Sequence, residues 1–301
     1  FTAGYGQLAI IIPLLLAAPR WFAKEVQVGW IMQVSNAFGQ VQGAMSYFVD
    51  AYTTIAQWCS VVRRLDGFNR HVSEALDLKS DLMIDNASNI KVGIENVDVF
   101  LPNKNKDILI KDCTIDLMKY QSLLIMGASG VGKSTLLRTL AGLWPYAKGN
   151  VYLPKEEEFL FLPQRPYLPL GSLRQAISYP VVEEVISEKY SDEEIKEILI
   201  ACKLENLADK LDIVDDWSRI LSLGEQQRIA FARILLYRPE FVFLDEATSA
   251  LDEDLEGNLY DMLKIHLPNT KIISIAHRSS LIAKHQAILR LKEKGCWEIH
   301  E

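Results

Sequence analysis

Residues 122–140 read SLLIMGASGVGKSTLLRTL, and this stretch decides the fold. A short apolar run leads into the glycine-rich loop GASGVGKST at 127–135, and a helical apolar pattern follows at once. The loop matches G-x-x-x-x-G-K-[ST] between a strand and a helix start, where backbone N–H groups and the positive helix end cradle a phosphate chain. A glycine-rich turn that caps an ordinary helix is the alternative. The flanking strand and helix patterns favour nucleotide binding.

The residues of this loop are expected to hold a nucleotide. Lys133 can reach the terminal phosphates, and the Ser134 hydroxyl can ligate Mg²⁺. The expected phosphate-binding residues are Gly127, Ala128, Ser129, Gly130, Val131, Gly132, Lys133, Ser134 and Thr135. The use of the bound nucleotide must be inferred from the rest of the chain.

The composition limits the classes of protein to consider. The 301 residues are enough for about two domains, and a chain that begins at Phe1 rather than Met is expected to be a fragment. The net charge of −7 argues against nucleic acid as a partner, although a local basic patch would escape this count. The four cysteines lie far apart and show no metal-binding spacing. We therefore expect free thiols in a reducing compartment.

The N-terminal part of the chain is apolar and nearly free of charge, which favours a membrane location. Residues 5–22 are uncharged until Arg20 and approach the length that spans a bilayer, if further residues precede them. Trp21 and Phe22, next to Arg20 and Lys24, are typical of an aromatic belt at the membrane interface. A buried core helix is the alternative. A signal peptide fits poorly, because no basic segment precedes the apolar run and no small-residue cleavage site follows it.

Residues 29 to about 64 can form one long helix with two different faces. One face carries Asn36, Gln40, Gly43, Tyr47 and Asp50, and the opposite face carries Val34, Phe38, Val41, Met45 and Tyr52. Such a helix suits a position between lipid and a watery cavity, and an amphipathic helix of a soluble bundle is the alternative. An acidic residue at membrane depth is usually functional, but Asp50 can also lie at the interface and be solvated. The cluster of Arg63, Arg64 and Arg70 predicts that this end of the helix is cytoplasmic.

The alternating segments at 91–100 and 108–117 predict two strands ahead of the phosphate loop. Phe100 is a candidate for stacking on adenine, because it shortly precedes the loop, and a core position is at least as well supported. Beyond the loop, residues 181–211 are charged and predict a solvated helical insert.

Polar residues follow several of the apolar segments. Gln164 closes an apolar run at a proline-flanked corner, where its amide can touch Mg²⁺ or an attacking water. Ser222 and the backbone of Gly224 precede an apolar helix and can form a second anion site, although such a pattern by itself is more often a simple helix cap.

Two buried strands are predicted to end at chemically active side chains. Residues 241–246 read FVFLDE, and ligands bind at this end of the strands in open parallel sheets. Asp245 suits a contact to Mg²⁺ through water, and Glu246 suits a general base. The strand at 271–276 ends at His277, which can contact a γ-phosphate or act as a polar cap.

The order of these features resembles the nucleotide-binding domain of an ABC transporter. The matching parts are the phosphate loop 127–135, the Gln164 loop, the signature 221–227, the Asp245–Glu246 strand end, SALD at 249–252, and His277. Further motifs are GLWP at 142–145, FLPQRPYLPL at 161–170, LSLGEQQR at 221–228, APRWF at 18–22 and AFGQVQG at 37–43. With these motifs the chain is further similar to subfamily D-like half-transporters with a membrane region of the SbmA/BacA type.

The resemblance implies an α/β P-loop NTPase domain of the ABC ATPase type at residues 76–301, with a helical subdomain at about 165–235. It implies that residues 1–75 hold the last two helices of an all-α transmembrane domain. It also implies a homodimer that binds ATP and Mg²⁺ between the phosphate loop of one chain and Ser222 and Gly224 of the other.

The resemblance also assigns roles. The implied catalytic residues are Glu246, His277 and Gln164; the implied Mg²⁺ contacts are Ser134, Gln164 and Asp245; and Asp252 and Phe100 join the nucleotide contacts. Leu101 is an alternative to Phe100 at the aligned position. Two positions of the signature depart from the family, since Leu223 replaces a glycine and Glu225 replaces a frequent glutamine. Because Ser222 and Gly224 are kept, we expect an active ATPase.

The expected function is the ATP-binding and ATP-hydrolysing half of a transporter that moves a substrate across the bacterial inner membrane by ATP-driven dimerisation. We expect a multi-pass protein in contact with lipid, with its ATPase domain in the cytoplasm. Acyl-CoAs, cobalamin and peptides are the possible substrate classes. A soluble ABC-type ATPase that regulates another process is the alternative, and an ATP-gated regulatory module would bind ATP without stimulated turnover.

Overall fold

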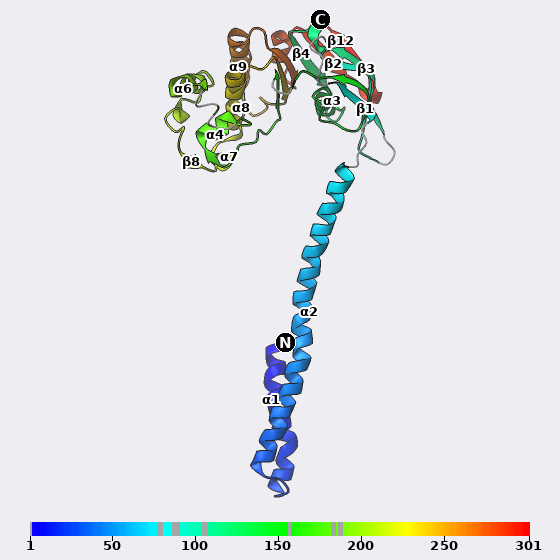
Figure 1. Cartoon of the computed structure of the whole chain (residues 1–301), viewed down its shortest axis with the longest axis vertical. Helices are drawn as coiled ribbons and strands as arrows, with labels where there is room; N and C mark the ends of the chain where they lie inside the picture. The colour runs from blue at the N-terminus through cyan, green and yellow to red at the C-terminus, as the bar shows by residue number, and fades with distance from the viewer. Residues whose placement is uncertain are drawn as a thin grey trace. The chain divides into compact units, whose positions relative to one another are not determined.

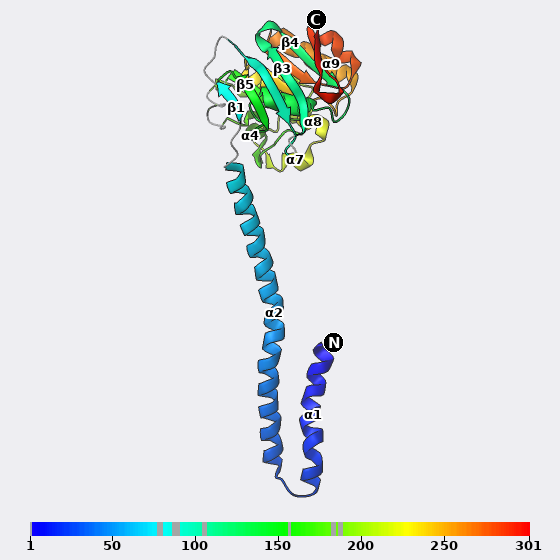
Figure 2. The ribbon, with the colours of Figure 1, turned by 90° about the vertical axis from the view of Figure 1, so that its right-hand side faces the viewer.

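The structure is a computed structural model that describes residues 2–76, 81–85, 91–103, 107–155, 158–181, 185 and 189–301. The chain divides into two compact units, residues 1–78 and residues 79–301. Figures 1 and 2 show the first unit as two helices coloured blue to cyan and the second as a mixture of helices and strands coloured cyan to red.

The N-terminal unit consists of the helices α1 (Thr2–Phe22) and α2 (Val28–Leu76). They run antiparallel (Figure 2). In the turn after α1 the Ala23 N–H donates to the Pro19 carbonyl at 3.0 Å. Both predicted helices are present, and α2 continues beyond its predicted end. Several large apolar side chains on them are exposed, among them Leu16 at 75% and Phe22 at 76%. Within the described residues, neither helix is apolar enough over a sufficient length to cross a membrane, so the expected spans are not shown.

The centre of the C-terminal unit is a six-stranded sheet in the order β12-β11-β4-β10-β9-β6. Its strands are β4 (Ser122–Gly127), β6 (Phe159–Leu162), β9 (Phe241–Asp245), β10 (Lys271–Ile275), β11 (Ala287–Leu291) and β12 (Trp297–His300). Every neighbouring pair is parallel except β11 and β12. Parallel strands are covered on both faces, which explains why all five residues of β9 are buried.

The register of this sheet brings the predicted site residues to one edge. Ile275 of β10 lies between Ile125 of β4 and Asp245 of β9. The carboxyl ends of these three strands therefore meet, and the phosphate loop, Glu246 and His277 all emerge from the same edge.

A second sheet in the order β1-β5-β2-β3 adds another layer. Its strands are β1 (Asp81–Asp85), β2 (Gly93–Phe100), β3 (Ile108–Asp116) and β5 (Ala147–Tyr152). The strands predicted at 91–100 and 108–117 are confirmed as β2 and β3, which pair antiparallel. The short strands β7 (Gly171–Ser172) and β8 (Val214–Asp215) form a separate antiparallel pair.

Among the described residues of this unit, the α-helices are α3 (Lys133–Leu140), α4 (Leu173–Ser178), α6 (Asp192–Ala201), α7 (Trp217–Ile220), α8 (Leu223–Tyr237) and α9 (Glu253–His266). The 3-10 helices are η1 (Leu117–Lys119), η3 (Glu205–Leu207), η4 (Ser279–Lys284) and η5 (Glu293–Gly295). Ser172, Ser191 and Ser222 each begin a helix with a capping box. The insert predicted at 181–211 contains α6 and η3, and its residues 182–184 and 186–188 lie outside the described residues.

The six-stranded sheet separates two apolar cores, because successive side chains along a strand point to opposite faces. Leu124 of β4 belongs to the core formed with α4, α6, α8 and α9. Its neighbours Leu123 and Ile125 belong to the core formed with α3 and the four-stranded sheet. Figure 1 shows these layers around β4. The α/β class expected from the sequence is confirmed.

Candidate functional site

The phosphate loop connects β4 to α3 in the predicted order of strand, loop and helix. Gly127 has φ +154°, and a Cβ atom there would lie 2.6 Å from the Leu291 carbonyl oxygen. Gly132 has φ +102° and caps the N-terminus of α3. Glycine tolerates both the left-handed backbone and the close approach, so backbone geometry explains both ends of the glycine pattern.

Lys133 is the first residue of α3 and is only 6% exposed. Its ammonium group donates to the carbonyl oxygens of Gly127 and Ala128, each at 3.0 Å. Burial lowers the pKa of Lys133, and the nearby Glu246 and Asp245 oppose this effect. The cation is therefore held inside the phosphate loop and close to the two acidic residues.

Ser134 and Asp245, which were assigned to Mg²⁺ from separate motifs, are in direct contact. The Ser134 hydroxyl donates to Asp245 Oδ1 at 2.6 Å, and Arg138 Nη2 lies 3.4 Å from Asp245 Oδ2. Among the described residues, no group of three or more His, Cys, Asp or Glu side chains is placed to hold a metal ion. A hydroxyl and a carboxylate beside a phosphate loop nevertheless fit Mg²⁺, which takes few protein oxygens and completes its shell with water and phosphate.

Glu246 and His277 form a second pair at the same edge. His277 Nε2 lies 2.9 Å from Glu246 Oε1, and the glutamate side chain is the less exposed of the two. The contact follows from the pairing of β9 with β10, because both residues come shortly after the ends of these strands. Glu246 has φ +50°, which is uncommon for a residue other than glycine and often marks a functional position.

Gln164 follows β6 with an exposed side chain, and its backbone carbonyl accepts a hydrogen bond at 2.9 Å from the side chain of Gln227. Gln227 belongs to the predicted signature 221–227 but was not predicted to have a role of its own. The Gln227 side chain is fully buried, and such an amide must have hydrogen-bond partners; the sequence signal that could have found it is its place at the start of the apolar run of α8.

Ser222 and Gly224 lie at the start of α8. The Ser222 hydroxyl donates to Glu225 Oε2 at 2.7 Å and accepts from the Glu225 N–H at 3.3 Å. The Ser222 hydroxyl also lowers the pKa of the Glu225 carboxyl. Glu225, which departs from the family's glutamine, is therefore the second half of a capping box. In the described part of the chain, no hydrogen bond joins Ser222 or Gly224 to the phosphate loop of the same chain.

Asp252 and Phe100 are placed by secondary structure. Asp252 caps α9, and its Oδ1 accepts from the Leu255 N–H at 2.7 Å. Phe100 is the partly buried last residue of β2, and its carbonyl accepts from Trp144 Nε1 at 3.1 Å. Neither geometry tests their proposed nucleotide contacts. The four cysteines are free, as expected.

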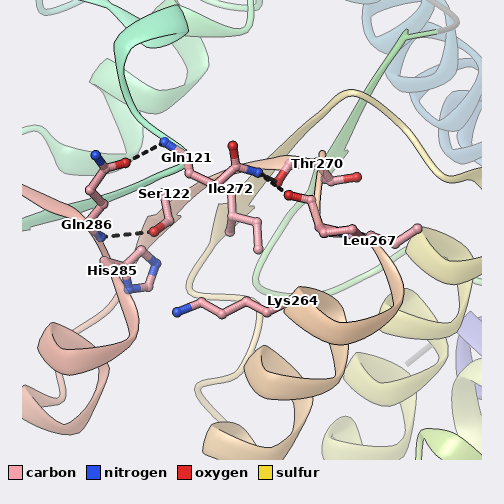
Figure 3. Close-up of a pocket in the computed structure, with 9 residues that line it drawn as sticks. Gln121, Ser122, Lys264, Leu267, Thr270, Ile272, His285 and Gln286 are labelled. Carbon is pink, nitrogen blue, oxygen red and sulfur yellow. Dashed lines mark hydrogen bonds between the residues drawn. The ribbon is translucent and has the colours of Figure 1, made fainter.

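A cavity of about 420 Å³ lies at the opposite edge of the sheet (Figure 3). Its lining includes Ser122, the first residue of β4, and Ile272 near the start of β10. Lys264 extends toward His285 across it (Figure 3). Because the phosphate loop follows the other end of β4, this cavity is not part of the candidate site.

His285 beside this cavity predicts a pH dependence of folding stability. Ser274 Oγ lies between the Tyr260 hydroxyl at 3.0 Å and His285 Nε2 at 3.1 Å, and His285 Nδ1 lies 2.8 Å from the Leu281 carbonyl. Burial lowers the pKa of His285 from 6.5 to about 4. Between these values the unfolded chain takes up a proton that the folded chain does not, so stability falls as the pH falls through this window.

Between pH 7 and pH 5, the free energy of unfolding of His285→Gln is therefore expected to fall by about 2 kcal/mol less than that of the wild type. Urea unfolding at the two pH values measures this difference. His266→Gln, which removes an exposed histidine at the end of α9, is the control and should behave as the wild type does. An equal loss in His285→Gln and the wild type would contradict the prediction.

The loop geometry and the two residue pairs at one sheet edge define a P-loop nucleotide-binding domain. Residues 110–249 match the family model described as ABC transporter, and residues 1–73 match the SbmA/BacA-like family. The chain belongs to the ABC transporter family, with the domain combination of a subfamily D-like half-transporter.

Relatives from different organisms share this similarity. An ABC transporter ATP-binding protein of Haemophilus influenzae is 42% identical over 299 residues, which are 99% of this chain and 49% of that protein. ABC transporter D family member 2, chloroplastic, of Arabidopsis thaliana is 35% identical over 358 residues, 97% of this chain and 50% of that protein. The lysosomal cobalamin transporter ABCD4 of Homo sapiens is 39% identical over 216 residues, 68% of this chain and 35% of that protein. This chain thus spans half the length of these curated relatives or less.

Proposed function

We propose that this chain is the ATP-binding and ATP-hydrolysing half of a membrane transporter that works as a homodimer. The observation that carries the proposal is the meeting of Lys133, the Ser134–Asp245 pair and the Glu246–His277 pair at one sheet edge. Transfer of a phosphoryl group to water requires three kinds of group: a fixed cation, oxygen ligands for a metal, and a carboxylate held in place, here by an imidazole.

In this proposal the side chains divide the work of hydrolysis. Lys133 binds the terminal phosphates of ATP. Glu246 accepts a proton from a water molecule while the oxygen of that water attacks the γ-phosphorus. The bond from the γ-phosphorus to the bridging oxygen breaks, which releases ADP and phosphate. His277 orients the Glu246 carboxylate and contacts the γ-phosphate. Bound Mg²⁺ would supply charge neutralisation at the phosphates, with Ser134, Asp245 and Gln164 as its contacts.

The signature residues support a site that is shared between two chains. Ser222 and Gly224 lie at the start of α8, where they would form the proposed anion site, and no hydrogen bond among the described residues links them to their own phosphate loop. A partner chain would supply the ATP for this site, so that ATP binding draws the two chains together. Asp252 and Phe100 complete the proposed nucleotide contacts, with Phe100 as the adenine-stacking residue.

The proposal extends to the N-terminal residues 1–75. We infer that they are the last two helices of a multi-pass transmembrane domain in a bacterial inner membrane, in contact with lipid, with residues 76–301 in the cytoplasm and a helical subdomain at about 165–235. The match to the SbmA/BacA-like family and the exposed apolar side chains of α1 and α2 support this placement. Closure of the ATPase dimer would then drive alternating access of the membrane part.

The transported substrate is proposed to be an acyl-CoA, cobalamin or a peptide. Cobalamin is supported by the name of the human relative. The deciding experiment is ATP-dependent uptake of the three substrate classes, side by side, into vesicles that contain the protein. Uptake of one class that is lost in Glu246→Gln would support transport. ATPase activity without uptake of any class, in a protein that is extracted without detergent, would favour a soluble regulatory ATPase instead.

A further inference from the structure

Gln227 lies in the first half of α8 and is completely buried. Its side-chain Nε2 donates to the Gln164 carbonyl at 2.9 Å and to Ser249 Oγ at 3.2 Å, and its Oε1 accepts from the Ala250 N–H at 3.0 Å. A carbonyl oxygen can only accept and a backbone N–H can only donate, so these partners fix the orientation of the amide. Both Nε2 hydrogens and the amide oxygen are in use.

The partners of Gln227 belong to two segments that carry proposed catalytic residues. β6 and β9 are neighbouring parallel strands with Leu162 opposite Leu244, so the loop after β6 and the turn after β9 leave the same edge. The loop contains Gln164. The turn begins at Glu246, whose carbonyl accepts from the Ser249 N–H at 3.1 Å. Gln227 therefore bridges the segment of the proposed metal contact and the segment of the proposed general base.

The neighbouring residue Gln226 shows what makes this arrangement different. Gln226 is also buried, but its Nε2 donates to the carbonyls of Ser218 and Leu221, each at 2.9 Å, immediately before its own helix. Its bonds therefore stabilise a local bend. The bonds of Gln227 reach 63 residues back to Gln164 and 23 residues forward to Ala250.

We propose that Gln227 is a positioning residue that holds the Gln164 loop and the Glu246 turn at a fixed spacing, so that the two segments move together. The inference rests on the proposed ATPase function. Glu246 keeps φ +50°, a backbone conformation that persists only where the surroundings determine it. The bonds from Gln227 to Ser249 and Ala250 are part of these surroundings. Because Ser222 is the N-cap of α8, the same helix also links both segments to the signature.

The test compares Gln227→Met with the wild type in the purified protein with ATP and MgCl2. Methionine has a similar shape but makes none of the three hydrogen bonds. We expect the kcat for ATP to fall by about ten- to a hundred-fold through misplacement of the reacting groups, with KM for ATP unchanged within about two-fold. Amide hydrogen exchange should increase in residues 163–168 and 246–252 together.

Two further variants separate positioning from general destabilisation. Thr270→Val removes another buried hydrogen bond, from Thr270 Oγ1 to the Pro239 carbonyl at 2.7 Å, just before the start of β10 and at the opposite end of the strand from the site, and should leave kcat unchanged. Ser249→Ala removes one of the three bonds of Gln227 and should destabilise the fold less than Gln227→Met does. Its effect on kcat should be smaller, and it should add nothing when combined with Gln227→Met.

Different experimental results would refute the proposed function and the positioning role of Gln227. A wild-type protein that hydrolyses no ATP would refute the proposed function, and hydrogen exchange would still test the bridge. Unchanged exchange in residues 163–168 of Gln227→Met would overturn the bridge in either case. In an active wild type, a kcat of Gln227→Met within about two-fold of normal, or an equal loss in Thr270→Val, would overturn the positioning role.

Discussion

Glu246→Gln is expected to reduce ATP turnover by about a hundred- to ten-thousand-fold, the range that loss of a general base produces. The amide has nearly the shape of the carboxylate but cannot accept a proton from water at neutral pH. ATP binding should be retained, because Lys133 and the glycine loop are unchanged. The dimer closed around ATP should therefore accumulate. Phosphate release measures the turnover, and light scattering with and without ATP measures the dimer.

The matched control for this prediction is Glu253→Gln. It removes the same charge from an exposed position in the first turn of α9 and should turn over ATP at the wild-type rate. Near-normal hydrolysis by Glu246→Gln would remove Glu246 from the role of general base. Loss of ATP binding in that variant would assign Glu246 to nucleotide binding instead.

Mixed dimers are expected to regain activity that both parent variants lack. Lys133→Met disables the phosphate loop, and Ser222→Asp places a negative charge where the partner's phosphates are proposed to lie. Aspartate is also a good helix cap, so the start of α8 should be preserved. In a dimer of one chain of each kind, one shared site carries both defects and the other carries neither. Such a dimer should therefore keep about half of the wild-type turnover.

The comparison needs dimers of defined composition, obtained by purifying through two different affinity tags in sequence. Each parent homodimer should be nearly inactive, because both of its sites carry a defect. A mixed dimer that is as inactive as its parents would mean that each chain uses its own signature, or that the signature is not part of the site. Either result would contradict the shared site.

The parts of the site that could be predicted from the sequence are those coded by local patterns. The glycine loop needs only a strand, two sterically required glycines and a helix start, all within residues 122–140. The two acidic residues after β9 could be placed at a ligand-binding edge, because a short, continuous apolar run predicts a buried parallel strand. Ser134 and Asp245 were each predicted to contact Mg²⁺ from a different motif. In the structure, Ser134 Oγ lies 2.6 Å from Asp245 Oδ1.

The rest depends on pairings that no local pattern encodes. The bridge made by Gln227 requires β6 beside β9, and the parallel pairing of β1 with β5 joins segments that precede and follow the phosphate loop. The capping role of Glu225 could have been predicted, because Ser222-x-x-Glu225 is a capping-box pattern. The nucleotide contacts proposed for Phe100 and Asp252 depend on molecules outside this chain.

The bonds of Lys133 to Gly127 and Ala128 have a consequence for how fast the protein can exchange nucleotide. These two bonds tie the Lys133 ammonium group to the backbone of its own loop, so contacts within the chain help to fix the shape of the loop. Association then requires a change of bonding partner at one ammonium group rather than the ordering of a flexible segment, which lowers the entropic cost of binding. In the proposed dimer, capture of ATP should accordingly be governed by diffusion and electrostatic attraction, and the slow steps of the cycle should lie in the later movements of the two chains.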